Sequence, residues 1–136
     1  MKQTKLTAND RGRHAELLAA TALLANGYSV LEPVSPQPYD LAIRDPYTLD
    51  TYYVQIKTAL LRAEPNDLKR YGREYLRISG ARNSGDVYLR DEVDYFIAVW
   101  DGECYMFPNR EISEYWISVD ELKTDASRWK KLETFI

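Results

Sequence analysis

Two strand-like runs lie close together in the chain, Tyr39-Asp40-Leu41-Ala42-Ile43 and, after a turn, Tyr53-Val54-Gln55-Ile56-Lys57. Side chains alternate between the two faces of a strand, so Gln55 and Lys57 share one face while Val54 and Ile56 share the other. A plain sheet would not need these polar side chains. If the two runs pair side by side, Asp40 lies close to Gln55 and Lys57, and the predicted site depends on this pairing.

The chemistry of this group predicts a site for a divalent metal ion and an attacking water. Mg²⁺ prefers oxygen ligands and keeps several waters, so one or two carboxylates are enough. We expect Asp40 to be the main ligand, with the side-chain carbonyl of Gln55 and the backbone carbonyl of Ile56 as further ligands. Glu16, on a predicted helix, is expected to reach the metal ion through water. Lys57 carries a compact charge that can orient the water and offset a phosphate.

The composition is that of an ordinary soluble protein. Hydrophobic residues make up 45% and charged residues 29% of the 136 residues, which excludes a disordered chain and predicts one domain over residues 1–136. No apolar run approaches the roughly 20 residues of a membrane helix, so no membrane association is expected. Cys104 is the only cysteine, which excludes an internal disulfide. These features favour a cytoplasmic protein.

The charge of the chain is unevenly distributed. A net charge of −3 argues against a protein that coats nucleic acid without selectivity, because such proteins are usually basic. The segment from Leu61 to Arg90, however, contains seven Arg and Lys residues and four acidic residues, so its local charge is +3. A solvated face of mixed charge is one interpretation of this segment, and a surface for phosphates is the other.

Local signals predict an α/β fold with a mixed central sheet. An alanine-rich helix is expected to begin at a cap formed by Asn9 or Asp10 and to end before Gly27. Asp101-Gly102 is a strong signal for a hairpin between two strands. The predicted strands are Tyr28–Leu31, Tyr39–Ile43, Leu49–Lys57, Asp94–Trp100 and Glu103–Phe107, with a short strand near Tyr75–Ile78 inside an otherwise irregular Leu60–Asn83. Short helices are predicted at Glu111–Trp116 and Ala126–Thr134.

Taken in order, these motifs resemble those of the PD-(D/E)XK nuclease superfamily. That pattern has an acid on the first helix, an aspartate after a proline-rich loop, and (D/E)-x-K on the next strand. Within the superfamily, the resemblance is closest to the group I intron-encoded homing endonucleases. The matching segments are Gly12 with Glu16, Gly27-Tyr28-Ser29-Val30, Tyr39-Asp40-Leu41, Val54-Gln55-Ile56-Lys57-Thr58 and Val93-Asp94-Tyr95-Phe96-Ile97-Ala98-Val99.

The resemblance implies a restriction-endonuclease-like fold, with a mixed central β-sheet flanked by helices, and an endonuclease that uses Mg²⁺, or Mn²⁺ in its place, to hydrolyse double-stranded DNA. The catalytic residues that it implies are Glu16, Asp40, Gln55 and Lys57. One small domain has one site while a duplex has two strands, so we expect a homodimer or homotetramer.

Contacts with DNA phosphates are expected from residues in and after the motif strand. The predicted DNA-binding residues are Arg13, Thr58, Arg62, Lys69, Arg70, Arg73 and Arg82. The tyrosines are expected mostly to pack in the core, with Tyr71 and Tyr75 as further candidates for DNA contact.

Gln55 departs from the pattern, because a neutral carboxamide stands where the motif has an acid. Archaeal Holliday junction resolvases, which are similar in motif order, carry an acid at this place. Two alternatives to a homing-type enzyme therefore stay open. One is a resolvase of branched DNA. The other is a catalytically inactive DNA-binding module of the same fold, which the neutral Gln55 and the acidic net charge favour.

Overall fold

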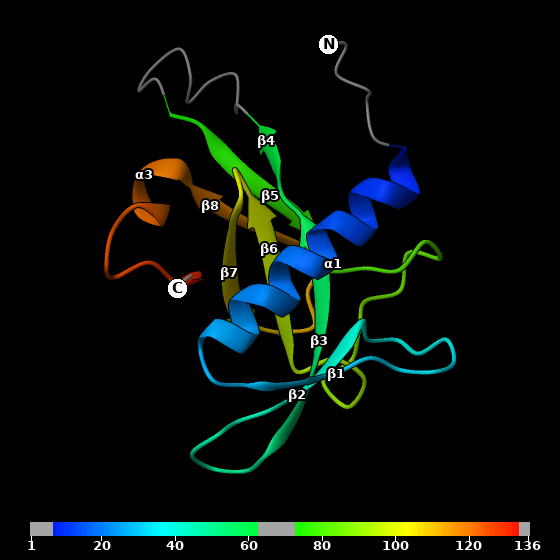
Figure 1. The fold of residues 1–136 in the computed structure, drawn as a ribbon. Helices are drawn as coiled ribbons and strands as arrows, with labels where there is room; N and C mark the ends of the chain where they lie inside the picture. Colours follow the sequence, from blue (N-terminus) through cyan, green and yellow to red (C-terminus); the bar gives the residue numbers. More distant parts are fainter. Residues whose placement is uncertain (1–6, 63–72, 134–136) are drawn as a thin grey trace, which may run out of the picture.

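The computed structural model describes residues 7–62 and 73–133, which form two β-sheets and a long helix packed on one of them (Figure 1). The helices are α1 Ala8–Ala25 and α3 Val119–Leu122. The strands are β1 Ser29–Leu31, β2 Leu41–Arg44, β3 Thr51–Thr58, β4 Leu60–Arg62, β5 Tyr75–Ser79, β6 Tyr95–Trp100, β7 Glu103–Pro108, β8 Glu114–Ser118 and β9 Lys130–Leu132.

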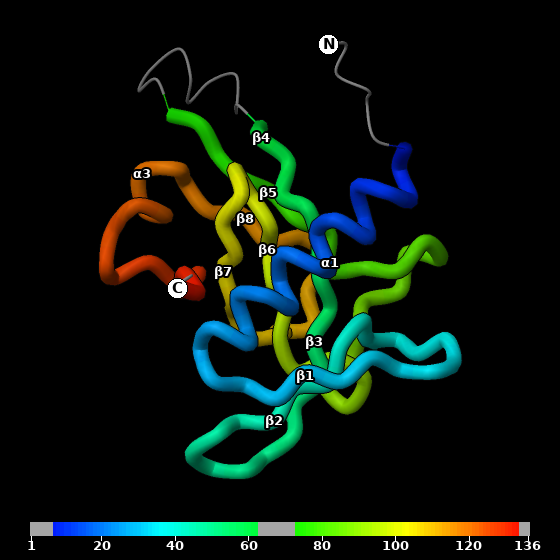
Figure 2. Tube along the Cα trace, in the orientation of Figure 1, coloured from blue at the N-terminus to red at the C-terminus, as the bar shows by residue number. Residues whose placement is uncertain are grey.

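The larger sheet is mixed, as predicted. Its strand order is β1-β2-β3-β6-β7-β9, and β3 is paired antiparallel with β2 and parallel with β6. A parallel pair needs a crossover connection, and here the crossover carries β4 and β5. These two strands join β8 in a second sheet of order β4-β5-β8. Figure 2 follows the chain from β3 into this smaller sheet and back to β6.

Two hydrophobic cores lie on opposite faces of the larger sheet. On one face, α1 buries Ala19 and Leu23 against residues of β2, β3 and β6. On the other face, Phe96 and Phe107 pack with Tyr115 and other residues of the smaller sheet. The result is three layers in the order helix, large sheet, small sheet, and it is consistent with the predicted restriction-endonuclease-like fold.

Helix α1 begins earlier than predicted. Thr7, rather than Asn9 or Asp10, is the N-cap, and its Oγ1 accepts a hydrogen bond of 3.1 Å from the Asp10 N–H. The predicted end of the helix is confirmed, because Gly27 follows the last turn with a φ of +88°, a conformation that glycine adopts without strain. Among the described residues, no helix is long and apolar enough to cross a membrane.

The predicted hairpin between β6 and β7 is confirmed. Asp101 and Gly102 have φ angles of 49° and 74°, so both central residues adopt the left-handed conformation that a type I′ turn requires. The register of the hairpin places Phe96 opposite Phe107, and both rings enter the same core. This turn therefore determines which face of the sheet the two aromatic residues occupy.

The predicted helix at Glu111–Trp116 is wrong, because Glu114–Ser118 forms strand β8. Tyr115 and Ile117 are each 1% exposed, whereas Trp116 between them is 42% exposed. This alternation has the period of a strand, and pairing with β5 satisfies the backbone. The irregular structure predicted for Leu60–Asn83 is also wrong at β4, although the strand expected near Tyr75–Ile78 is confirmed as β5.

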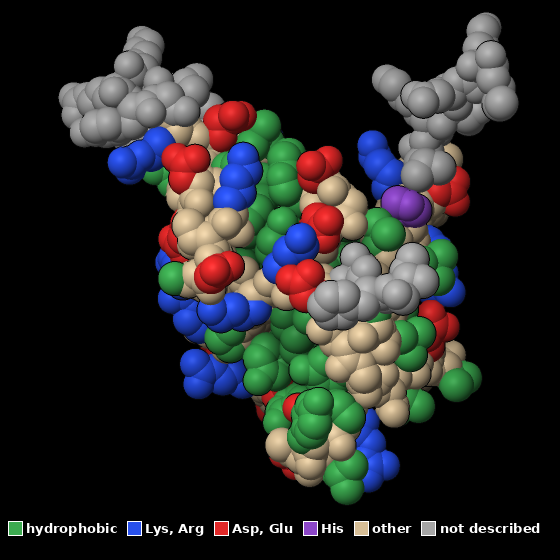
Figure 3. Space-filling view, turned by 60° about the vertical axis from the view of Figure 1, so that its left-hand side comes forward, with side chains coloured by type: hydrophobic (Ala, Val, Ile, Leu, Met, Phe, Trp, Pro, Cys, Tyr) green, Lys and Arg blue, Asp and Glu red, His purple; other side chains and the backbone are tan. Residues whose placement is uncertain are grey.

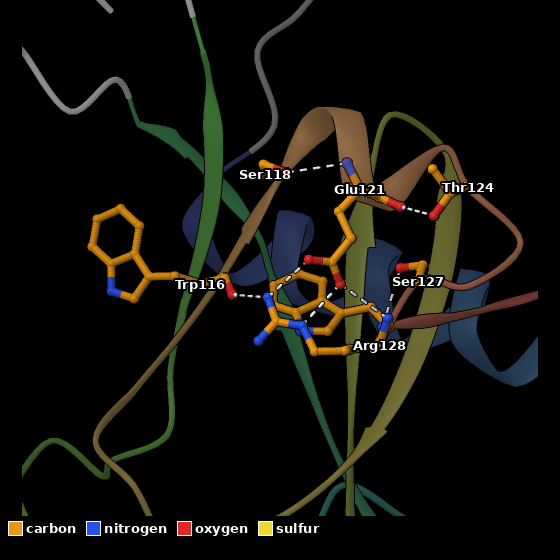
Figure 4. Close-up of polar contacts among 7 residues, drawn as sticks. Trp116, Ser118, Glu121, Thr124, Ser127 and Arg128 are labelled. Carbon is orange, nitrogen blue, oxygen red and sulfur yellow. Dashed lines mark hydrogen bonds and ion pairs between the residues drawn. The ribbon is translucent and has the colours of Figure 1, made fainter. Parts of the chain in front are cut away.

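The helix predicted at Ala126–Thr134 is wrong over its described part, residues 126–133. Trp129 stacks on Phe107 with 4.5 Å between the ring centroids, and Lys130–Leu132 forms β9 beside β7. Figure 4 shows that Arg128 turns back toward α3, where its guanidinium donates to both carboxylate oxygens of Glu121 at 2.8 and 3.1 Å. Burial of the tryptophan ring and the ladder with β7 override the helical preference.

Candidate functional site

Strand β3 carries the predicted motif, and its two faces differ as expected. Val54 and Ile56 are buried in the core beneath α1. Gln55 and Lys57 are half-buried on the opposite face, toward the smaller sheet. The pairing of β2 with β3, on which the predicted site depends, is confirmed by a register that runs from Leu41 opposite Val54 to Arg44 opposite Thr51.

Asp40 lies where β2 begins and is bonded directly to β3. Its N–H donates to the Val54 carbonyl at 2.9 Å, and its Oδ2 accepts a hydrogen bond of 2.8 Å from the Ile56 N–H. One further step of the register would place Asp40 opposite Gln55, and opposite residues of an antiparallel pair share a face of the sheet. The structure therefore brings Asp40 to the motif strand, on the face that carries Lys57.

The Ile56 carbonyl points to the same edge of β3 as the Asp40 carboxylate. In a strand, the N–H and C=O of one residue point to the same side. The Ile56 N–H donates a hydrogen bond to Asp40, so the Ile56 carbonyl also points toward the side of β3 on which Asp40 lies. The ladder between β2 and β3 ends at Leu41 and Val54, so it does not extend to Ile56. A carboxylate oxygen and a backbone carbonyl oxygen are thus both directed to this edge.

The charges of Asp40 and Lys57 act on each other across this edge. Burial raises the pKa of the Asp40 carboxyl, the Ile56 N–H lowers it, the negative charge of Glu16 raises it, and the positive charge of Lys57 lowers it. Burial lowers the pKa of the Lys57 ammonium, and the charge of Asp40 opposes that effect. Both groups are therefore held partly out of water, where their interaction is stronger than in bulk solvent.

Glu16 approaches the site from the helical layer. It lines an open hollow of about 420 Å³ together with Asp40, Arg13 and the loop of residues 32–37. Its carboxylate is not free, because Arg13 Nη1 lies 3.2 Å from Glu16 Oε2 and 2.9 Å from Glu32 Oε1. Arg13, predicted to contact DNA, is thus engaged by two glutamates in this structure.

Tyr88 is a neighbour of the site that the motifs did not indicate. Its ring centroid lies 5.5 Å from Lys57 Nζ and 5.1 Å from Arg82 Cζ. Burial and the charge of Asp40 raise the pKa of the Tyr88 hydroxyl. The sequence predicts that Tyr88 packs in the core, and its side chain is buried; its position beside Lys57 results from the tertiary fold.

The other predicted DNA-binding residues are scattered. Thr58, Arg62 and Arg73 are exposed, whereas Arg82 forms an ion pair with Glu92. Lys69 and Arg70 lie outside the described residues, as does Tyr71. On the face in Figure 3, basic and acidic side chains are interspersed around a strip of hydrophobic ones. That face therefore presents mixed charge instead of a uniformly basic surface.

The oxygen atoms at the β3 edge fit Mg²⁺ better than a soft metal. Among the described residues, no three His, Cys, Asp or Glu side chains gather closely enough to hold a metal ion. Asp40 Oδ1 accepts no hydrogen bond from any described residue, and the Ile56 carbonyl points to the same edge of β3. Mg²⁺ binds through one or two carboxylates and keeps its remaining waters, so this small set of oxygen donors is compatible with it.

The raised pKa of Asp40 predicts how its charge affects stability without metal. The pKa of Asp40 is higher in the folded state than in the unfolded state, so ionised Asp40 destabilises the fold at pH values above the folded-state pKa. At pH values below the unfolded-state pKa, Asp40 is protonated in both states and this effect vanishes. Asp40→Asn keeps an oxygen for the Ile56 N–H and removes the charge. We expect it to raise the free energy of unfolding at pH 7 and not at pH 3, measured by urea denaturation in EDTA.

Asp91→Asn is the matched control for this measurement, because Asp91 is exposed. It should change the free energy of unfolding by less than about 0.5 kcal/mol at either pH. If Asp40→Asn lowered stability at pH 7 and not at pH 3, the Asp40 charge would be stabilising, in contradiction to the effect of burial.

Comparisons with known proteins agree with this architecture. Residues 6–135 match the family model described as PD-(D/E)XK endonuclease. A solved structure described as a bacterial homing endonuclease, I-Ssp6803I, is similar with a TM-score of 0.58 and 21% sequence identity, over 83% of this chain and 76% of that chain. At this identity the likeness concerns the fold. No curated protein matches the chain in sequence. Because the family model spans nearly the whole chain, the protein belongs to the PD-(D/E)XK endonuclease family.

Proposed function

We propose that the protein acts as one domain that cleaves double-stranded DNA with the help of Mg²⁺, as a homing-type endonuclease. The observation that carries this proposal is the hydrogen bond from the Ile56 N–H to the Asp40 carboxylate. Ile56 directly precedes Lys57 in β3. This bond holds the Asp40 carboxylate on the strand that carries the Lys57 amine, and both side chains are half-buried, which supports the proposal. The similar fold of a bacterial homing endonuclease supports the homing type.

The metal ion would be held by Asp40 Oδ1 and the Ile56 carbonyl, with Gln55 as a third oxygen donor and Glu16 acting through water. A divalent cation bound there supplies charge for the phosphate and activates a water for attack. Mn²⁺ has similar ligand preferences and is expected to substitute. The ion pair with Arg13 engages Oε2 of Glu16, so Oε1 would be the oxygen that binds such a water.

Lys57 would orient the attacking water and offset the charge of the scissile phosphate. An ammonium has three donors and a compact charge, which suits it to both tasks. Its partial burial strengthens these interactions, because less solvent screens them. Thr58 at the end of β3, and Arg62 and Arg73 beyond it, would contact phosphates along the duplex, as would Lys69 and Arg70 outside the described residues.

A DNA-binding module without catalysis is the second candidate, and two observations favour it. Gln55 is neutral, which leaves the site with one negative charge fewer than the motif supplies. Glu16 is engaged by Arg13. Such a module would bind DNA equally well with or without Mg²⁺ and would cleave it with no divalent ion.

Cleavage assays with variants of the two central residues test the proposed activity. Asp40→Ala and Lys57→Ala should each slow cleavage of supercoiled plasmid in Mg²⁺ or Mn²⁺ by at least about 100-fold, because they remove the metal ligand and the water-orienting cation. Asp91→Asn and Lys123→Ala, at exposed positions, should cleave like the wild type. Wild-type rates in Asp40→Ala and Lys57→Ala would refute the site, and binding without cleavage by every variant would favour the module. Faster cleavage of a four-way junction than of linear duplex would indicate a resolvase.

Restoring the missing acid tests the role of Gln55. Gln55→Glu adds a negative charge beside Asp40, and we expect it to lower the Mg²⁺ concentration for half-maximal cleavage about tenfold, equivalent to about 1.4 kcal/mol. Gln37→Glu adds the same charge to the hollow beside Asp40 without changing β3. An equal effect of both substitutions would show a general electrostatic influence and would exclude Gln55 as a ligand.

Cleavage of both strands of a duplex should require more than one chain. Because each chain supplies one Asp40 and one Lys57, we propose a homodimer or homotetramer on DNA with symmetric half-sites. Analytical ultracentrifugation of the protein with a duplex substrate should give a complex that contains two or four chains. A single chain bound to a duplex that is cut in both strands would contradict this proposal.

A further inference from the structure

The Lys57 ammonium has an aromatic partner in place of an acidic one. Among the described residues, no carboxylate forms an ion pair with Lys57, whose charge instead lies 5.5 Å from the centroid of the Tyr88 ring. A lysine side chain has four rotatable bonds and needs a contact to stay in one place. The electron-rich face of an aromatic ring attracts an ammonium at this distance.

The Tyr88 ring is itself held in a fixed position. Its backbone N–H donates to the Gly80 carbonyl at 3.2 Å, and its carbonyl accepts a hydrogen bond of 2.9 Å from Asn109 Nδ2. Asn109 is 2% exposed and also donates to the Val93 carbonyl, which fixes both ends of the segment between them. The ring of Tyr88 meets that of Phe96 edge to face, with 6.1 Å between centroids. The ring therefore belongs to the core of the molecule and not to a surface loop.

A second cation approaches the same ring. Arg82 Cζ lies 5.1 Å from the Tyr88 centroid, and the guanidinium forms an ion pair with Glu92. Glu92 is in turn bound through Oε1 to the Leu89 N–H at 3.2 Å. Arg82 was expected to bind DNA phosphates, but in this structure its guanidinium is paired with an acid and packed against the tyrosine. The packing of the Arg82 guanidinium against the Tyr88 ring helps to hold the ring in position.

We propose that Tyr88 is the positioning residue for Lys57: its ring holds the ammonium at the β3 edge beside Asp40. This rests on the proposed function, in which Lys57 orients the attacking water. The ring, and not the hydroxyl, carries the effect, because the contact is with the aromatic face. Arg82 and Glu92 act on Lys57 only through this ring.

Single-turnover cleavage at saturating protein, together with the DNA dissociation constant in Ca²⁺, tests the proposal. Tyr88→Leu should slow cleavage at least about tenfold with less than a twofold change in DNA affinity, because a displaced catalytic group affects the chemical step. Tyr88→Phe, which keeps the ring, should cleave within about twofold of the wild type. Tyr105→Leu is the matched control, since Tyr105 and Tyr88 are both 8% exposed and belong to the same core.

Equal cleavage by Tyr88→Leu and Tyr105→Leu would overturn the proposal, because the loss would then be one of core packing. Equal impairment of Tyr88→Phe and Tyr88→Leu would also overturn it by assigning the effect to the hydroxyl. If Tyr88→Leu does not fold, Tyr88→Met also removes the aromatic face, and its longer, unbranched side chain adapts more easily to the space that the ring leaves.

Nuclear magnetic resonance of ¹³C-labelled lysine separates this inference from the proposed function. The ring current of Tyr88 should shift the Lys57 Hε resonances upfield in the wild type and in Tyr88→Phe, and the shift should vanish in Tyr88→Leu. This result would uphold the contact even if the wild type cleaved no DNA. Unshifted resonances in a wild type that cleaves DNA would overturn the positioning role and leave the nuclease proposal intact.

Discussion

The hydrogen bond from the Ile56 N–H to the Asp40 carboxylate is the contact on which the candidate site is built. The ladder between β2 and β3 stops at Leu41, and a buried strand cannot leave its next N–H unpaired without a loss of stability. Asp40 satisfies that group with a side-chain oxygen. The bond therefore completes the backbone pairing of the sheet and fixes a carboxylate against the strand that carries Lys57.

The position of β3 explains why charged groups can gather at this edge. One of its faces lies in the core beneath α1, whereas the opposite face, toward the smaller sheet, carries the half-buried Gln55 and Lys57. Asp40 lies at the edge where the two faces meet, so Glu16 from the helical layer and Lys57 from the opposite face both act on its pKa. The cost of partial burial is reduced, for Asp40, by the backbone N–H and the Lys57 charge and, for Lys57, by the aromatic ring of Tyr88.

Sequence patterns predicted the parts of the fold that carry a strong local signal. The alternation in β3, the left-handed Asp101-Gly102 turn and the glycine at the end of α1 each have a local stereochemical cause and are confirmed. Strands β4, β8 and β9 were missed because they have only three to five residues and are held by partners far away in the chain. For Trp129, burial against Phe107 decided the conformation, and no local pattern indicates that contact.

The sequence by itself determined the order of the motifs, the residue types at the site and the face of β3 on which Gln55 and Lys57 lie, because a strand alternates its side chains whatever surrounds it. Only the tertiary structure decided which charges are engaged. Arg13 and Arg82 are equally basic in the sequence, but each is paired with an acid that folding brings to it. The contact between Lys57 and Tyr88 likewise exists because the crossover through the smaller sheet returns the chain to β3, and such a contact depends on topology and not on local preference.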